Sequence, residues 1–109
     1  MTVRELVSAG GFRFLSEAEA ERTVSGVYVG DLLSWVMGRA EEDNLWMTIM
    51  TNANVIAVAS LVNVSAVILC EGCIPDDEVC RLAREKGINL LVTSERIYEC
   101  ALRLGALLP

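Results

Sequence analysis

Histidine is absent from this chain of 109 residues, and proline, aromatic and basic residues are scarce. Without histidine, the chain lacks the side chain that most often serves general acid–base catalysis and zinc binding. Catalysis would rest on carboxylates, lysine or cysteine, yet the sequence contains no paired-carboxylate motif and no nucleophile that can be matched with a base. The sequence therefore predicts neither an enzyme nor a cofactor.

Basic side chains are outnumbered by acidic ones. There are 9 Lys and Arg residues against 15 Asp and Glu residues, which gives a net charge of −6. The resulting negative field repels phosphate backbones and anionic lipids, whereas nucleic-acid binders usually carry a basic patch. We therefore expect neither a nucleic acid nor a membrane as a partner.

Signal-like and membrane-spanning segments are also missing. Residues 1–6 lack the basic region and the apolar stretch of a secretory signal. The most apolar region, residues 45–70, is interrupted by Thr, Asn and Ser, so no unbroken span reaches the roughly 20 residues that a bilayer needs. The four cysteines of such a chain are expected to be reduced thiols. These features predict a cytoplasmic protein without disulfides.

Apolar residues are present in excess. They make up 53% of the chain, and the mean hydropathy is +0.44. One domain covering residues 1–109 has little interior volume in which to bury them. Part of its surface is therefore expected to contact another chain.

Strands and helices are predicted to alternate along the sequence. Short β-branched and apolar runs favour strands, while N-capping residues followed by apolar residues at helical spacing favour helices. This alternation predicts a three-layer α/β domain with a mainly parallel sheet, βαβ units and flanking helices. Strands are predicted at residues 12–15, 23–29, 45–50, 66–69 and 89–92, and helices after Thr2, Asp31, Asn52 or Asn54, Pro75, and Thr93–Ser94.

Polar residues follow the predicted parallel strands, where the sheets of α/β proteins usually bind ligands. Each of these residues can equally serve as a helix cap or turn. The acidic ones count against a bare phosphate, and neither a Walker loop nor a dinucleotide fingerprint occurs. The pattern predicts a small molecule or nucleotide as the ligand. The candidates are Asp31, Ser34, Thr51, Asn52, Asn54, Glu71, Gly72, Thr93 and Ser94.

Cys70 and Cys73 form a Cys-x-x-Cys motif at a predicted strand end. This spacing allows a redox pair or half of a metal site. A zinc site usually needs four ligands, and Cys100 lies on the apolar face of its own helix. Small buried thiols are common, so a structural role competes with the redox role, and we assign no metal.

Three exposed apolar residues are candidates for an interface. Trp35 points away from the apolar face of its helix, where the indole either covers a loop or contacts a partner. Tyr98 and Leu102 lie beside a wide apolar sector of the last helix, and the central helix, residues 55–62, is apolar almost all round. We predict a homodimer that uses the central and last helices and Trp35.

The segment 26–38, Gly-Val-Tyr-Val-Gly-Asp-Leu-Leu-Ser-Trp-Val-Met-Gly, resembles short stand-alone DRTGG domain proteins. This module is similar to the N-terminal domain of HPr kinase/phosphorylase and occurs in phosphate acetyltransferases and in pyrophosphatases with CBS domains. The order of strands and the Pro75 helix start extend the resemblance over nearly the whole chain. The name-giving residues differ, because Asn52, Ala53 and Asn54 replace Asp-Arg, and residues 70–72 keep only Gly72 of Thr-Gly-Gly.

The resemblance implies dimerisation and regulation, and for stand-alone members it implies a partner enzyme such as an iron hydrogenase. HPr kinase activity is not implied, since it belongs to a separate kinase domain. Three hypotheses follow: a self-associating regulatory module, a sensor of a small ligand, and a thiol redox or metal-binding accessory protein that uses Cys70 and Cys73.

Overall fold

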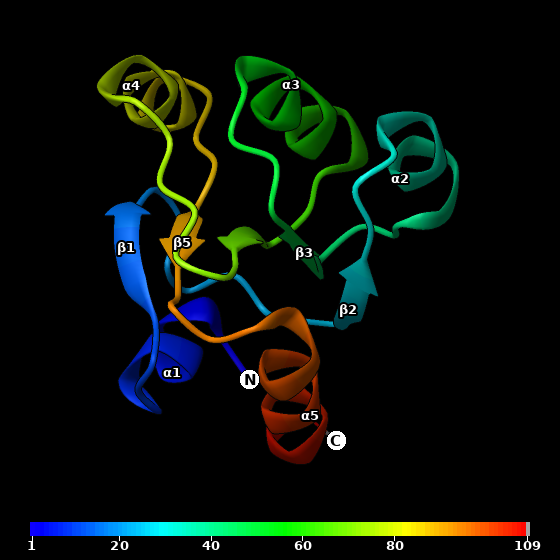
Figure 1. Ribbon diagram of the computed structural model, residues 1–109, viewed down its shortest axis with the longest axis vertical. Coiled ribbons are helices and arrows are strands. Elements are labelled where there is room, and N and C mark those ends of the chain that lie inside the picture. The colour runs from blue at the N-terminus through cyan, green and yellow to red at the C-terminus, as the bar shows by residue number, and fades with distance from the viewer. Residues whose placement is uncertain (109) are drawn as a thin grey trace.

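A five-stranded sheet runs through the middle of the computed structural model, which describes residues 1–108 (Figure 1). The strand order is β1-β5-β4-β3-β2. Strands β2 to β5 are parallel to one another, and β1 is antiparallel to β5. The mainly parallel sheet is thus confirmed. The strands are β1 (Arg13–Ser16), β2 (Gly26–Val29), β3 (Asn44–Thr48), β4 (Ala66–Leu69) and β5 (Leu90–Val92).

Helices cover both faces of the sheet, which confirms the three-layer α/β fold. Figure 1 shows α2, α3 and α4 side by side on one face, and α1 and α5 on the other. Helices α2, α3 and α4 connect successive parallel strands, so they form the expected βαβ units. The helices are α1 (Val3–Ser8), α2 (Leu33–Arg39), α3 (Ala53–Val62), α4 (Asp77–Glu85) and α5 (Ile97–Leu107).

Each face of the sheet has its own apolar core. On one face Trp46 of β3 and Val67 of β4 pack among residues from α2, α3 and α4. On the other face Leu45 and Ile68 pack with residues from α1 and α5. All residues of β3, β4 and β5 are buried, as expected of continuous apolar strands that are covered on both sides.

The central helix α3 lies between α2 and α4 (Figure 1). Val55, Ile56, Val58 and Ala59 are buried, whereas Leu61 is 72% exposed. Its neighbours therefore cover most of its apolar surface. Little of this helix is left for the interface in which the sequence had placed it.

Three helix starts follow the sequence prediction. The Thr2 hydroxyl accepts the Glu5 N–H while the Glu5 carboxylate accepts the Thr2 N–H, a capping box for α1. Asn52 caps α3, and Asp76, directly after Pro75, caps α4. These side chains satisfy backbone donors that have no partner inside the helix.

The other two predicted caps are wrong. Helix α2 begins after Leu32 without a side-chain cap, because the Asp31 carboxylate bonds elsewhere. Helix α5 begins after Arg96, so Thr93 and Ser94 lie too early to cap it. The strand predicted from Thr23 begins only at Gly26, and Thr23 itself makes an isolated bridge to Thr2.

None of the helices among residues 1–108 is both long and apolar enough to cross a membrane.

Candidate functional site

Asp31 braces the loops that follow β2 and β3. Its Oδ1 accepts hydrogen bonds from the Thr48 hydroxyl at 2.7 Å and from the Ile49 N–H at 3.2 Å. The carboxylate thus bonds to residues of its own domain and holds the ends of two strands together. Ser34, the second residue of α2, is exposed beside this loop.

The turn after β4 has a left-handed backbone at two successive residues. Glu71 has φ 61° and Gly72 has φ 74°. The Glu71 N–H donates to the Glu95 carbonyl at 2.8 Å, and the Gly72 N–H donates to the Thr93 carbonyl at 3.0 Å. The Glu71 carboxylate also accepts the Ile97 N–H at 3.4 Å, which caps α5 from a distant part of the chain.

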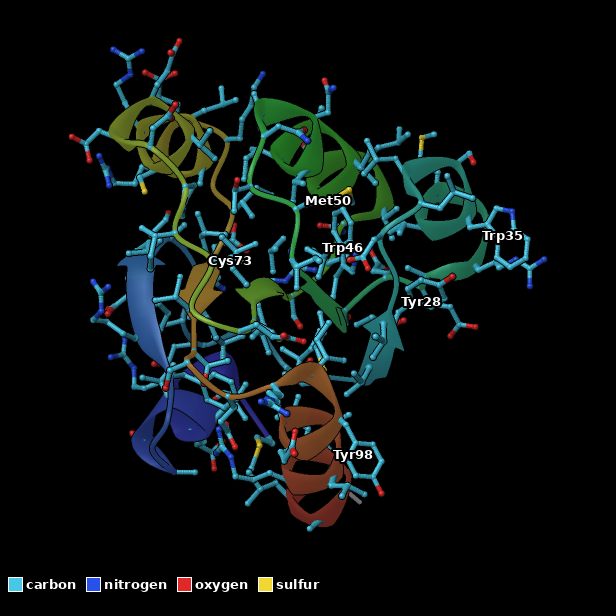
Figure 2. All side chains as sticks on the ribbon, viewed as in Figure 1. Tyr28, Trp35, Trp46, Met50, Cys73 and Tyr98 are labelled. Carbon is cyan, nitrogen blue, oxygen red and sulfur yellow. The ribbon has the colours of Figure 1, made fainter. Side chains whose placement is uncertain are left out.

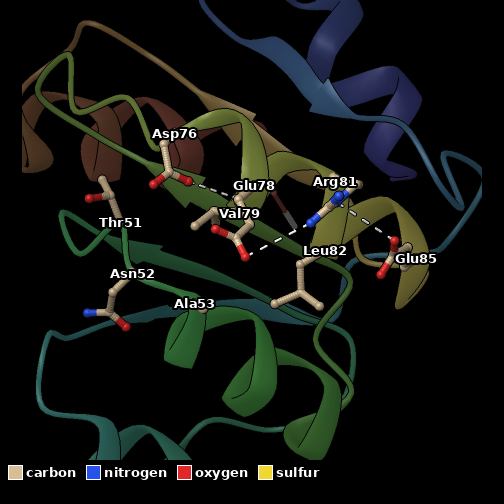
Figure 3. Close-up of a pocket in the computed structure, with 9 residues that line it drawn as sticks. All are labelled: Thr51, Asn52, Ala53, Asp76, Glu78, Val79, Arg81, Leu82 and Glu85. Carbon is tan, nitrogen blue, oxygen red and sulfur yellow. Dashed lines mark hydrogen bonds and ion pairs between the residues drawn. The ribbon is translucent and has the colours of Figure 1, made fainter.

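A cleft of about 460 Å³ opens between the start of α3 and the side of α4 that faces it (Figure 3). Of the predicted ligand residues, Thr51 and Asn52 line it. The facing side of the cleft comes from the start and body of α4 and carries three carboxylates and one guanidinium. These α4-side residues are Asp76, Glu78, Val79, Arg81, Leu82 and Glu85.

The charge in this cleft is mainly negative. Arg81 lies 3.9 Å from both Glu78 and Glu85, so its positive charge is shared between two carboxylates (Figure 3). Asp76 accepts the Val79 N–H at 3.1 Å as a helix cap. A polyphosphate would meet net repulsion here, whereas a neutral or cationic ligand that donates hydrogen bonds would not.

A second, shallower cleft of about 410 Å³ contains three more of the predicted residues, Gly72, Thr93 and Ser94. It lies where the end of β5 meets the start of β1, and its remaining lining includes Arg13 and Ile74. The predicted ligand residues are therefore divided between two places. Asp31, Ser34, Asn54 and Glu71 line neither of these two clefts.

Arg103 and Glu95 form an ion pair under the start of β1 that the sequence did not reveal. The Arg103 Nη1 donates to the Gly10 carbonyl at 2.8 Å, and its guanidinium lies over the Phe12 ring at 4.4 Å. The hydrogen bond from Arg103 holds the pKa of the Glu95 carboxyl below its usual value. A separation of eight residues is not a regular helical spacing, so no pattern pointed to this pair.

The nearest thiol partner of Cys70 is Cys100, and not Cys73 as the Cys-x-x-Cys hypothesis had required. Cys70 is fully buried, and its thiol lies against that of Cys100, also fully buried, on the α5 face of the sheet. The neighbouring Cys100 thiol and burial both raise the pKa of Cys70. Cys73 is half-buried in the turn. Among residues 1–108, no three Cys, Asp or Glu residues are grouped so that they could hold a metal ion.

Exposed apolar side chains gather at the β2 edge of the sheet. Figure 2 shows Tyr28 of β2, Trp35 of α2 and Tyr98 of α5 on this same side of the molecule. Trp35 is 54% exposed and Tyr98 is 70% exposed. We call this region the β2-edge surface and define it by the exposed apolar residues of β2 and of the neighbouring segments. These are Val29 of β2, Leu32 and Trp35 at the start of α2, Ile49 directly after β3, and Tyr98 and Leu102 one turn apart on α5.

Comparison with known proteins places this architecture in a family. The family model for the DRTGG domain matches residues 5–107. The chain belongs to the DRTGG domain family. No curated protein matched the chain.

A solved structure agrees with this assignment at the level of the fold. It contains the CBS and DRTGG domains of the regulatory region of Clostridium perfringens pyrophosphatase, complexed with the activator diadenosine tetraphosphate. The TM-score is 0.72 at 17% sequence identity, over 94% of this chain and 45% of that one. The present chain thus spans less than half the length of that structure.

The DRTGG fold is kept although the name-giving residues have changed. Asn52, in place of the family's Asp-Arg segment, caps α3 through the Asn54 N–H at 2.9 Å. Gly72, the one retained glycine of the Thr-Gly-Gly segment, has the positive φ that favours glycine. Both positions therefore still serve the backbone geometry of the DRTGG domain.

Proposed function

We propose that this DRTGG domain is a non-catalytic regulatory module that self-associates through the β2-edge surface. The observation that carries the proposal is the presence of exposed apolar side chains at one edge of the sheet, among them Trp35 and Tyr98. Singly exposed apolar residues are ordinary, but several on neighbouring elements at one edge of the sheet favour a binding surface. A cytoplasmic location is in keeping with the four free thiols.

Trp35 and Tyr98 have the properties of interface anchors. Large aromatic side chains with few rotatable bonds contribute most to many protein interfaces. The Arg39 guanidinium lies 3.9 Å from the centre of the Trp35 ring, which restricts the indole, and Trp35 is still 54% exposed. The net charge of −6 opposes association of two copies, so apolar contact has to supply the affinity.

Sedimentation equilibrium over a range of protein concentrations tests this proposal. We expect a dimer, and we expect the double variant Trp35→Ala, Tyr98→Ala to weaken it by roughly 100-fold. Leu61→Ala is the matched control, because Leu61 is at least as exposed as Trp35 and Tyr98 but lies on α3, away from the β2 edge. A wild-type chain that stays monomeric at the highest concentration would refute self-association.

A second candidate function is recognition of a small molecule in the cleft lined by Thr51 and Asn52. The carboxylates of Asp76, Glu78 and Glu85 favour a ligand that donates hydrogen bonds and carries no phosphate chain. The activator of the Clostridium perfringens protein carries such a chain. We therefore propose that the ligand class differs between the two proteins.

Thermal unfolding with adenosine and with diadenosine tetraphosphate as probes tests the charge argument. Adenosine is expected to raise the melting temperature more than the polyphosphate does, since only the polyphosphate meets the repulsion. A larger increase with diadenosine tetraphosphate would contradict the proposed ligand class. Thr51→Ala is the matched variant: it removes a polar side chain of the cleft without removing the α3 cap at Asn52, and it should reduce the increase.

The thiol redox hypothesis for Cys70 and Cys73 has less support. A buried thiol with a raised pKa is a poor nucleophile, because the thiolate is the reactive form. Titration of the anaerobic protein with a thiol reagent is expected to leave Cys70 unmodified until the protein unfolds. Rapid modification of Cys70 in the folded protein would restore this hypothesis.

A partner enzyme also stays a prediction, which co-purification can test.

A further inference from the structure

We propose that two copies of this chain associate by antiparallel pairing of their β2 strands around a twofold axis at Tyr28. The two five-stranded sheets then form one continuous sheet. The inference rests on the proposed self-association and adds its geometry and its partner, a second copy of the same strand.

The outer side of β2 has free backbone groups. Strand β2 pairs only with β3 among the described residues 1–108. The Gly30 N–H donates to the Met47 carbonyl, so Gly30 directs its N–H toward β3. Alternate residues of a strand bond to the same neighbour, so Val27 and Val29, out of phase with Gly30, direct their N–H and C=O groups outward. A second strand can therefore pair here.

Nothing in the sequence of β2 blocks such pairing. Residues 26–30 contain neither a charged residue nor a proline, the two kinds that usually protect an edge strand. The charged residues that flank this segment in the sequence, Arg22 and Asp31, each bond to another side chain of the same domain, although Asp31 is exposed. Arg22 donates to Asp43 at 2.6 Å, and Asp31 accepts from the Thr48 hydroxyl at 2.7 Å.

The outward-facing residues Val27 and Val29 lie on either side of Tyr28, and this arrangement selects a register centred on Tyr28. Glycines lie at both ends of the segment 26–30, and Tyr28 is its central residue. With the axis at Tyr28, Val27 lies opposite Val29 of the partner subunit, and Val29 lies opposite Val27 of the partner subunit. Opposite residues whose backbones face each other exchange two hydrogen bonds. Four backbone hydrogen bonds therefore form, with the two Tyr28 residues as the close pair between them.

Apolar side chains flank the strand on both faces of the sheet. Val27 packs with the core on the α5 face, where Tyr98 and Leu102 are exposed. Tyr28 packs with the core on the α2 face, where Trp35 is exposed (Figure 2). The twofold axis lies between the two β2 strands and is perpendicular to the sheet, so each of these surfaces meets the same surface of the partner subunit. One pairing thus covers both halves of the β2-edge surface.

The available area fits a second copy. The exposed parts of the six β2-edge side chains amount to roughly 600 Å², against about 800 Å² that one partner contributes to a specific interface. The backbone of β2 and its neighbouring side chains supply the remainder. A peptide strand alone would cover the edge but would leave much of Trp35 and Tyr98 exposed.

Disulfide mapping tests this register. The half-buried thiols are first removed by Cys73→Ser and Cys80→Ser, while the buried Cys70 and Cys100 are kept. In this background Tyr28→Cys is expected to form an intermolecular disulfide with a mild oxidant, because opposite Cα atoms of a close pair are about 4.5 Å apart. Val27→Cys is the matched control, since two copies of residue 27 lie about 8 Å apart, too far for a disulfide.

Mixing two cysteine variants provides a second test, in which Tyr28 is not changed. Val27→Cys and Val29→Cys are expected to cross-link with each other, and each roughly tenfold more slowly with itself. If sedimentation gives a dimer but Tyr28→Cys and the mixture fail to cross-link, β2 pairing is wrong while self-association stands. Efficient cross-linking of Val27→Cys alone would overturn the register. A monomeric wild-type chain would overturn both proposals.

Discussion

The two edges of the sheet differ in how their free backbone is treated. Strand β1 begins with the charged Arg13, has an irregular register between Phe14 and Ser16, and has its Leu15 carbonyl bonded by the Arg84 guanidinium at 3.3 Å. Strand β2 has no charged residue, and its register with β3 is regular. Natural proteins usually protect edges by the means seen at β1. The unprotected β2 edge therefore indicates a binding surface.

The β1 side is also fixed by buried polar anchors. The Ser16 hydroxyl donates to the Ile88 carbonyl at 2.8 Å. The Asn89 side chain, 2% exposed, accepts from the N–H groups of Ala18 and Glu19 and donates to the carbonyls of Glu19 and Ser65. These bonds attach the loop after β1 to the sheet. Rigidity on the β1 side thus contrasts with open surface on the β2 side.

The largest expected effect comes from giving β2 the kind of charge that protects β1. Val29→Lys places an ammonium group on each copy at the proposed junction, and we expect the dimer to weaken by at least about 100-fold, or roughly 3 kcal/mol. Sedimentation equilibrium measures this change. Leu61→Lys introduces the same charge at an exposed apolar site on α3, away from the β2 edge, and should leave the mass unchanged. Equal weakening by both variants would remove the distinction between β2 and the rest of the surface.

A smaller effect is expected from loosening the β1 side. Asn89→Ala leaves a buried carbonyl and two loop N–H groups without partners, so the free energy of unfolding should fall by about 2 kcal/mol or more. Urea denaturation followed by circular dichroism measures the loss. The dimerisation constant of the folded protein should not change. A variant as stable as the wild type would show that this anchor is dispensable.

The smallest effect concerns pH and the Glu95–Arg103 pair at the start of β1. Because Arg103 lowers the pKa of Glu95 in the folded protein, the stabilisation is present above the pKa of an unfolded glutamate, near the ordinary 4.5, and is lost as the pH falls through the lower folded value. At pH 7, Glu95→Gln should therefore cost about 1 kcal/mol, since the pair is partly exposed.

At pH 3 the same substitution should cost less than at pH 7, because pH 3 lies below the pKa of an unfolded glutamate and the stabilisation shrinks as the pH approaches the lowered pKa of folded Glu95. Denaturant unfolding of both proteins at the two pH values gives the comparison. A cost that stays constant between pH 7 and pH 3 would mean that the charge of Glu95 does not support the fold. Neither the substitution nor the change in pH should alter the dimerisation constant through this pair, because the pair lies away from β2.

Much of the fold followed from the sequence because short-range patterns determine it. The apolar strands, the capping box of Thr2 and Glu5, and the helix start after Pro75 all lie within a few residues of the groups that they organise. The wide apolar sector of α5 and the outward position of Trp35 were also visible, since helical periodicity fixes the face of each residue.

Long-range choices between competing partners could not be predicted. The Asp31 carboxylate suited a helix cap but bonds to Thr48, 17 residues away. Cys70 meets Cys100 across the sheet. The predicted strand residue Asn89 is a four-bond anchor. In each case the side chain had several possible partners, and only the three-dimensional packing decided among them.

The ligand residues illustrate the same limit. Thr51 and Thr93, which were predicted from their positions after strand ends, each line a cleft. The sequence could not show that α4 separates these residues into two different clefts, or that Glu71 caps α5. Their role in ligand binding stays a proposal.

Hydrogen exchange of individual backbone amides at several protein concentrations tests the β2-edge account most directly. The Val27 and Val29 amides are expected to exchange fast in dilute protein and to become protected as the mass doubles, while protection of the β1 amides stays constant. If the mass doubles but exchange at Val27 and Val29 does not change, the copies associate elsewhere and the account of the β2 edge is wrong.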